Sequence, residues 1–355
     1  MPATRPGRIG TFGIGLAAYW PQFPGLKERL EGYQREVEAR LMAMGAEVVS
    51  VGLVDTAPAA RQAGERLAAA GLDLLVCYVG TYATSSQVLP IVQHEHVPVL
   101  VLNLQPTAAL DYENTDTGEW LANCSTCCVP EISNAFARAR VKFRVVSGTL
   151  RDDAVAWGAI EEWVKAAAVV RSLRTSRIGF LGHTYPGMLD MYSDFTMVTA
   201  QTGAHIEVLE MCDLDACVNE VSAEEVEAKC VVARETFTFE NVSEPDLQWA
   251  ARVASGLDRL VQRFDLHGLT YYYRGLDGNR YEQLGAGMIL GNSLLTARGV
   301  PAGAYRPCQE AMSNSPGKPA SRKVGTLGHT AMRLVLATPK GFRRPVLMSC
   351  CRVTV

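Results

Sequence analysis

The stretch that most constrains this chain is an apolar strand that runs directly into a polar loop, at residues 97–124. Val97 to Leu104 has the length and composition of a strand that is buried on both faces. In an open α/β sheet, ligands bind outside the carboxyl ends of the strands. The stretch therefore predicts a site for a small polar molecule, although its side chains could instead only cap a helix and complete a turn. The polar residues at the end of the strand are Asn103, Gln105, Asp111, Glu113, Asn114 and Asp116.

Strands and helices alternate along most of the chain, with short connections between them. This alternation predicts parallel, right-handed, doubly wound sheets. We expect an N-terminal α/β domain at residues 1–172 and a central one at 173–303, both Rossmann-like. The expected strands are 8–16, 47–54, 72–79, 97–104 and 143–147, then 177–182, 206–211 and 269–274. The expected helices are 26–44, 57–70, 87–92 and 152–173, then 213–233, 244–264 and 279–297.

Composition restricts the partners of the chain. Its 355 residues carry a net charge of −3, which gives no electrostatic case for nucleic acid. Residues 305–355 are basic, with nine Lys or Arg against one acid, but no nucleic-acid module accompanies them. Ten scattered cysteines are typical of reduced thiols, and no apolar run approaches the roughly 20 residues that span a membrane. We expect a cytoplasmic protein that binds neither nucleic acid nor membrane.

The glycine-rich first strand does not favour a dinucleotide site. Gly10, Gly13 and Gly15 lack the GxGxxG spacing. Tyr19 and Trp20, followed by a proline, stand where a helix should begin under a pyrophosphate. Aromatic faces at the end of a strand suit the apolar face of a sugar ring, or they serve only packing.

Two further motifs each have a structural and a functional interpretation. Cys124, Cys127 and Cys128 form a CxxCC sequence, but no second ligand pair follows at zinc-binding spacing. We therefore expect buried thiols on a helix. His183 follows a strand, which makes it either a site residue or a hydrogen-bonded structural histidine.

Several strings in the chain suggest a family. The chain resembles the L-arabinose isomerase and L-fucose isomerase group of metal-dependent aldose–ketose isomerases. The resemblance rests on IGLAAYWPQFPGL, YVGTYATSSQVLP, LVLNLQPTAALDYENTDTGEW, RIGFLGHTYPGMLDM and YYYRGLDGNRYEQLGAGMILGNSLLTARGVPAG. It implies two Rossmann-like domains followed by a mostly β domain, assembled as a trimer or hexamer. It also implies proton transfer between C1 and C2 of a sugar, through an enediol held by Mn²⁺.

The resemblance assigns roles to particular residues. Gln105, Tyr19 and Tyr273 fall on substrate-contacting positions, and His329 falls on a metal-binding histidine. Ala304 stands where the family has a metal-binding glutamate that also acts as acid or base, and alanine can do neither. Residues 304–355 are then a truncated, partly disordered remnant of the C-terminal β domain.

Two functions from different classes follow from these observations. The first is an isomerase of the arabinose and fucose type, with activity impaired by the missing glutamate. The alternative is a catalytically silent cytosolic sugar-binding protein that uses the cleft between its two α/β domains. In both cases the partner is a small sugar.

Overall fold

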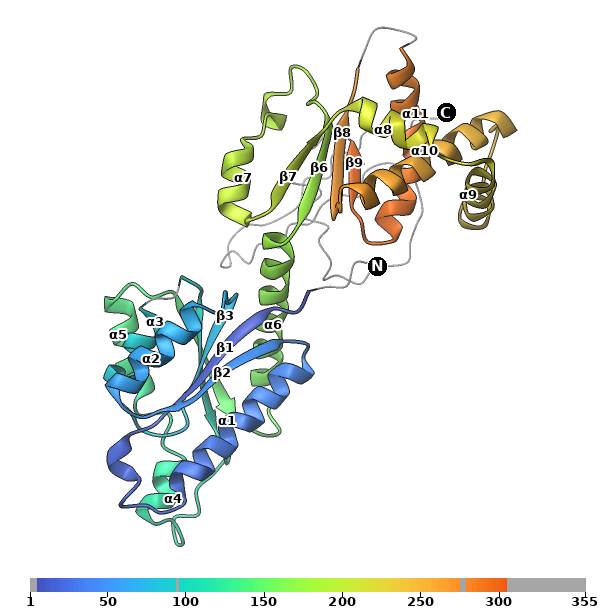
Figure 1. Cartoon of the computed structure of the whole chain (residues 1–355). Coiled ribbons are helices and arrows are strands. Elements are labelled where there is room, and N and C mark those ends of the chain that lie inside the picture. Colours follow the sequence, from blue (N-terminus) through green and yellow to red (C-terminus); the bar gives the residue numbers. More distant parts are fainter. Residues whose placement is uncertain (1–4, 94–95, 275–278, 305–355) are drawn as a thin grey trace, which may run out of the picture. The chain divides into compact units, whose positions relative to one another are not determined.

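The computed structural model describes residues 5–93, 96–274 and 279–304. The chain divides into two compact units, one ending at Thr175 and the other beginning at Ser176. Each unit is an α/β structure built on a parallel sheet (Figure 1). The fold class predicted from the alternation of strands and helices is therefore correct for the described residues, while the expected C-terminal remnant lies almost entirely outside them.

The first unit contains a five-stranded parallel sheet in the order β2-β1-β3-β4-β5. The neighbours of β1 are β2 and β3, so the chain moves outward in opposite directions from this strand. At such a reversal, the connections that leave two adjacent strands run in opposite directions. Open α/β sheets bind ligands in the crevice between these connections. The strands are β1 (Arg8–Ile14), β2 (Glu47–Val54), β3 (Leu74–Tyr78), β4 (Val99–Gln105) and β5 (Phe143–Thr149).

Helices cover both faces of this sheet (Figure 1). On one face α1 (Leu26–Ala43) and α6 (Ala154–Arg174) pack through a core that includes Leu30, Leu41 and Ile160. On the other face lie α2 (Ala57–Ala68), α3 (Leu89–Val92) and α5 (Val129–Arg138). Because β3 and most of β4 are buried on both faces, these strands read as continuous apolar runs. The remaining short elements are η1 (Ala17–Tyr19), η2 (Ser85–Gln87) and α4 (Thr117–Ala122).

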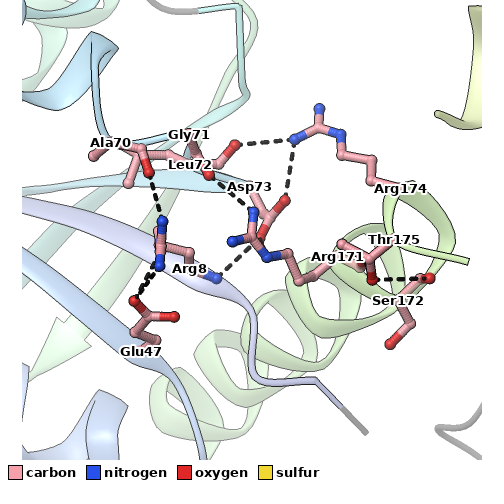
Figure 2. A network of polar contacts seen from close by, with 10 residues as sticks. All are labelled: Arg8, Glu47, Ala70, Gly71, Leu72, Asp73, Arg171, Ser172, Arg174 and Thr175. Carbon is pink, nitrogen blue, oxygen red and sulfur yellow. Dashed lines mark hydrogen bonds and ion pairs between the residues drawn. The ribbon is translucent and has the colours of Figure 1, made fainter.

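A buried carboxylate fastens the end of α6 to the sheet (Figure 2). The side chain of Asp73, at the entry to β3, has no exposed surface. The backbone N–H of Arg8 donates to its Oδ2 at 2.9 Å, and Nη1 of Arg174 donates to its Oδ1 at 3.0 Å. Nε of Arg171 lies 3.9 Å from Oδ2. A buried charge requires such partners, and here they join β1, β3 and α6.

The second unit contains a four-stranded parallel sheet in the order β7-β6-β8-β9. Its strands are β6 (Arg177–Gly182), β7 (His205–Leu209), β8 (Gly268–Tyr272) and β9 (Ala302–Ala304). The main core forms between β6, β8 and the helices α8, α10 and α11. The helical elements are η3 (Leu189–Met191), α7 (Phe195–Thr202), α8 (Met211–Asn219), α9 (Ala223–Thr236), α10 (Glu244–Arg263) and α11 (Arg280–Ala297).

Most predicted elements are confirmed to within a few residues, with two informative differences. Cys124, Cys127 and Cys128 all lie in the connection between α4 and α5, and Cys127 is exposed, so the prediction of buried thiols on a helix is wrong. The strand expected at 206–211 ends at Leu209, because Glu210 forms a capping box with Asp213 and starts α8. Among the described residues, no helix has the length and apolar composition needed to cross a membrane.

Candidate small-molecule site at the carboxyl edge of the first sheet

The connection after β1 is an aromatic loop at the reversal point of the sheet. It contains the turn η1, and α1 begins only at Leu26, after Gly25 in a left-handed conformation with φ +83°. No α-helix therefore starts directly after β1, where a pyrophosphate-binding motif would place one. The loop is fastened by Trp20, whose Nε1 donates to Oδ2 of Asp55 at 2.8 Å.

A network of amide and hydroxyl groups lies at the carboxyl end of β4. Nε2 of Gln105 donates to Oγ of Ser125 at 2.9 Å and to Oγ1 of Thr126 at 2.6 Å. Ser125 donates in turn to Oδ1 of Asn103 at 2.8 Å, and Nδ2 of Asn103 donates to Oγ of Ser147 at 3.0 Å. Both amide hydrogens of Gln105 are thus used, and no hydrogen bond to its Oε1 is made by the described residues. Gln105 therefore presents an oriented acceptor at the strand end.

Tyr19 belongs to the same edge of the sheet. Its ring packs edge-on against Trp20 and Phe23, with centroids 6.4 and 6.2 Å away. Burial raises the pKa of the Tyr19 hydroxyl, and the nearby Tyr82 and Cys124 side chains raise it slightly further. The segments that follow β3 and β4 also meet at this edge, where Oγ1 of Thr81 donates to the carbonyl oxygen of Leu121 at 2.7 Å.

A hollow of about 320 Å³ lies further along the connection after β4. Its lining combines two aromatic rings with hydroxyl groups and one carboxylate: Tyr112, Trp120, Thr115, Thr117 and Asp116. Trp120 is 46% exposed and Tyr112 is 86% exposed, so both rings offer free surface. The volume is near the lower end of the range of about 300–1,000 Å³ that small-molecule sites occupy.

The charge near the hollow is negative. Asp116 caps α4, its Oδ1 accepting from the backbone N–H of Glu119 at 2.7 Å. The amide of Asn114 and the backbone N–H of Glu113 hold the pKa of Asp111 below its usual range. Asp111 is therefore ionised at neutral pH and acts only as an acceptor. The nearby cation Arg29 forms a two-pronged ion pair with Glu119, which cancels its charge locally.

The second unit carries an aromatic cluster at the corresponding end of its own sheet. Tyr273 is half-buried directly after β8, and its ring centroid lies 6.0 Å from that of His183 and 5.9 Å from that of Tyr281. His183 is exposed after β6, and its Nδ1 lies 3.3 Å from the carbonyl oxygen of Thr184. Tyr273 and Gln105, which were expected to share one site, belong to different units.

The described structure gives no support to the metal-binding and acid–base positions that the resemblance implied. Ala304 is the last residue of β9, where its backbone pairs with Tyr271. His329 lies outside the described residues. Within the described part of the chain, no three His, Cys, Asp or Glu side chains gather closely enough to hold a metal ion. The prediction of Mn²⁺ therefore rests on the resemblance alone.

Comparison with known proteins gives only distant matches. No protein-family model matches the chain, and no curated protein matches it. One similar solved structure is an ABC sugar transporter subunit from Rhodobacter sphaeroides, 10% identical, covering 84% of this chain and 77% of its own, with a TM-score of 0.21. Another is a carbohydrate transporter from Acidothermus cellulolyticus in complex with myo-inositol, 12% identical, covering 84% and 72%, with a TM-score of 0.21.

A third match is an ABC transporter solute-binding protein from Agrobacterium vitis bound with α-D-tagatopyranose. It is 12% identical and covers 84% of this chain and 93% of its own, with a TM-score of 0.20. At TM-scores this low the backbones do not superpose as wholes. We therefore assign neither function nor ligand from these three matches.

These findings correct the predicted membership of the L-arabinose and L-fucose isomerase group. No protein-family model and no curated protein supports it. Two of the strings that suggested the group begin at the last residue of β1 or β3, and the other three begin within β4, β6 or β8 and continue past the end of the strand. A doubly wound sheet requires aliphatic strands and glycine-containing turns whatever its function, and a shared fold does not imply a shared reaction. The predicted isomerase reaction is withdrawn, together with the role expected at position 304.

Sequence reasoning missed four residues of this edge: Tyr112, Trp120, Ser125 and Thr126. All four lie in or next to the 97–124 stretch. The polar run after an apolar strand was the signal for the region. No pattern in the sequence indicates that the two hydroxyl residues inside CSTCC orient the amide of Gln105, because that contact depends on how the loop folds back.

Proposed function

We propose that the first unit binds a small, uncharged, hydroxyl-rich molecule, such as a sugar or polyol, at the carboxyl edge of its sheet. The observation that carries this proposal is the oriented network of Asn103, Gln105, Ser125 and Thr126. Amides and hydroxyls can each donate and accept, as sugar hydroxyls do. The exposed rings of Tyr112 and Trp120 supply faces that suit the apolar side of a sugar ring.

The local charge favours neutral ligands over anionic ones. Asp111 is ionised and Asp116 is exposed at the hollow, so a phosphate or carboxylate on the ligand would meet like charge. Arg29, whose charge could offset this repulsion, is paired with Glu119. A carboxylate accepts readily from a sugar hydroxyl, whereas it repels an anion at short range.

Titration calorimetry and thermal melting with a panel of neutral aldoses, ketoses and cyclic polyols test this proposal. The phosphate esters of the same compounds serve as the comparison. We expect at least one neutral compound to bind and to raise the melting temperature, because a ligand that binds only the folded state stabilises it. Its phosphate ester should bind more weakly. If no neutral compound binds, or if the esters bind better, the proposal is wrong.

The substitution Gln105→Leu tests the site itself. It removes the oriented acceptor and leaves Ser125 and Thr126 without their donor. Loss of such hydrogen bonds costs about 1–3 kcal/mol, so we expect the dissociation constant to rise by roughly 5- to 150-fold. Gln62→Leu, at an exposed position of α2, is the matched control and should leave the dissociation constant unchanged. Equal affinity in the two variants would place the ligand elsewhere.

A further inference from the structure

The connection between α4 and α5 brings two thiols of a CxxC sequence together. Sγ of Cys124 and Sγ of Cys127 lie 2.7 Å apart. The S–S bond of a disulfide is about 2.0 Å long, so a shift of less than about 1 Å would join these sulfurs. Two other residues separate the cysteines, the spacing found in redox-active dithiols.

The two thiols differ in their access to solvent. Cys127 is exposed, whereas Cys124 is 6% exposed. Burial raises the pKa of the Cys124 thiol, with a smaller contribution from its contact with Cys127. Cys127 is therefore the thiol that an outside reagent meets first, and Cys124 is placed behind it as the resolving partner.

The third cysteine of the motif points elsewhere. Cys128 is 1% exposed and packs in the core beneath α5. Its Sγ contacts the carbonyl oxygens of Thr81 at 3.5 Å and Ser125 at 3.4 Å. Burial raises its pKa to about 11, so it is largely protonated at neutral pH. Cys128 is thus a natural internal control for the pair.

The residues between the two thiols are the residues that hold Gln105. Ser125 and Thr126 accept both amide hydrogens of Gln105, at 2.9 and 2.6 Å. Closing a disulfide across Cys124 and Cys127 would tighten the short loop that contains both hydroxyls. Because hydrogen bonds weaken steeply away from their preferred geometry, a displacement of either hydroxyl would misplace the Gln105 amide.

We propose that Cys124 and Cys127 form a reversible dithiol–disulfide couple that weakens ligand binding at Gln105 when it is oxidised. The oxidant is a small-molecule disulfide such as oxidised glutathione. The Cys127 thiolate attacks one sulfur of this disulfide, forming a mixed disulfide and releasing one thiolate. The Cys124 thiolate then attacks Sγ of Cys127 and releases the second thiolate. The protein loses two electrons and two protons, and the external disulfide becomes two thiols.

Mass spectrometry of the full chain in glutathione redox buffers tests the couple. After alkylation and denaturation, cleavage at Glu119 and Glu131 releases residues 120–131, WLANCSTCCVPE, which contain all three cysteines. We expect oxidised buffer to yield this peptide two hydrogens lighter and alkylated at one cysteine, and reductant to restore three alkylated cysteines. The disulfide should persist in Cys128→Ser and be lost in Cys127→Ser. No disulfide in Cys128→Ser under fully oxidising conditions overturns the proposal.

The predicted effect of oxidation on ligand binding rests on the proposed function. It is measured with the neutral compound that binds best in the panel above. We expect its dissociation constant to rise at least fivefold on oxidation of Cys128→Ser, and to stay constant in Cys127→Ser. If the dissociation constant is the same before and after oxidation, the effect on ligand binding is overturned, although the disulfide itself is not. If no panel compound binds the reduced protein, the proposed function fails and the coupling with it, whereas the mass measurement still decides the dithiol couple.

Discussion

Single residues fix the geometry of the first unit from both ends of its sheet. At the carboxyl end, Gln105 connects β4 to the loop before α5. At the opposite end, Asp73 connects β3 to β1 and α6 (Figure 2). The two side chains differ in their exposure to solvent. The amide of Gln105 is half-exposed and can face a ligand, whereas the carboxylate of Asp73 is buried and serves structure.

The substitution Asp73→Asn should destabilise the first unit. In this variant the new side-chain amide nitrogen would face either the N–H of Arg8 or the guanidinium of Arg174. Two hydrogen-bond donors would then oppose each other at a place where a charge-assisted hydrogen bond forms in the natural chain. Bonds to charged groups contribute about 1.5–3 kcal/mol, and the partial exposure of Arg174 places the expected loss near the lower value. Urea unfolding followed by circular dichroism measures it. Glu65→Gln, exposed on α2, is the control, and an equal midpoint for both variants would show that the Asp73 network contributes nothing.

At the scale of whole elements, packing distance decides where glycine is required inside a helix. α2 and α3 pack at backbone distance, because a Cβ on Gly64 would lie 2.8 Å from the carbonyl oxygen of Pro90 and 3.1 Å from Cα of Ile91. Gly158 in α6 is different, since a Cβ there would meet nothing within 4 Å. The same residue type therefore has a packing role in one helix and none in the other.

Alanine at these two positions should change stability in opposite directions. Gly64→Ala forces α2 and α3 apart, and overpacking of this kind costs about 1–3 kcal/mol. Gly158→Ala removes backbone freedom from the unfolded chain and should stabilise α6 by about 0.5–1 kcal/mol. The free energy of unfolding from urea titration checks both values. Destabilisation of similar size at both sites would mean that close packing is not the reason for Gly64.

At the scale of the whole molecule, the first unit has what an independent domain needs. It contains a five-stranded sheet covered on both faces, with a hydrophobic core on each side. Helix α6 completes one of these cores through Trp157, Ile160 and Val164. The trimeric or hexameric assembly implied by the isomerase resemblance is not tested by this structure, and the boundary expected near residue 172 remains a prediction.

Residues 5–175, produced alone, should fold and should bind the same neutral ligand as the full chain. A shorter piece, 5–150, lacks α6 and leaves one face of the sheet without its helix. We expect cooperative urea unfolding for the longer piece and none for the shorter. If both pieces unfold cooperatively, α6 is not needed to complete the core. If neither does, the first unit depends on the rest of the chain.

Sequence reasoning succeeded where the signal is local and failed where it required distant comparison. The apolar runs and helical stripes identify most strands and helices, because burial imposes those patterns directly. The polar run after β4 lies at the carboxyl edge of the sheet, where the sequence placed it. The same strand and turn sequences also suggested an isomerase, since they are shared by proteins with unrelated chemistry. Family resemblance carried by scaffold segments was therefore a poor guide to the reaction.

The sequence by itself determined the two parallel sheets, their helices and the strand end where polar groups collect. Only the tertiary structure decided which side chains meet there. Gln105 finds Thr126 across 21 residues, and Asp73 finds Arg174 across 101 residues. Periodicity is a property of each element and can be read along the chain. Contacts between elements depend on the order of strands and the path of the loops, so the network at Gln105 and the paired thiols beside it become visible only after folding.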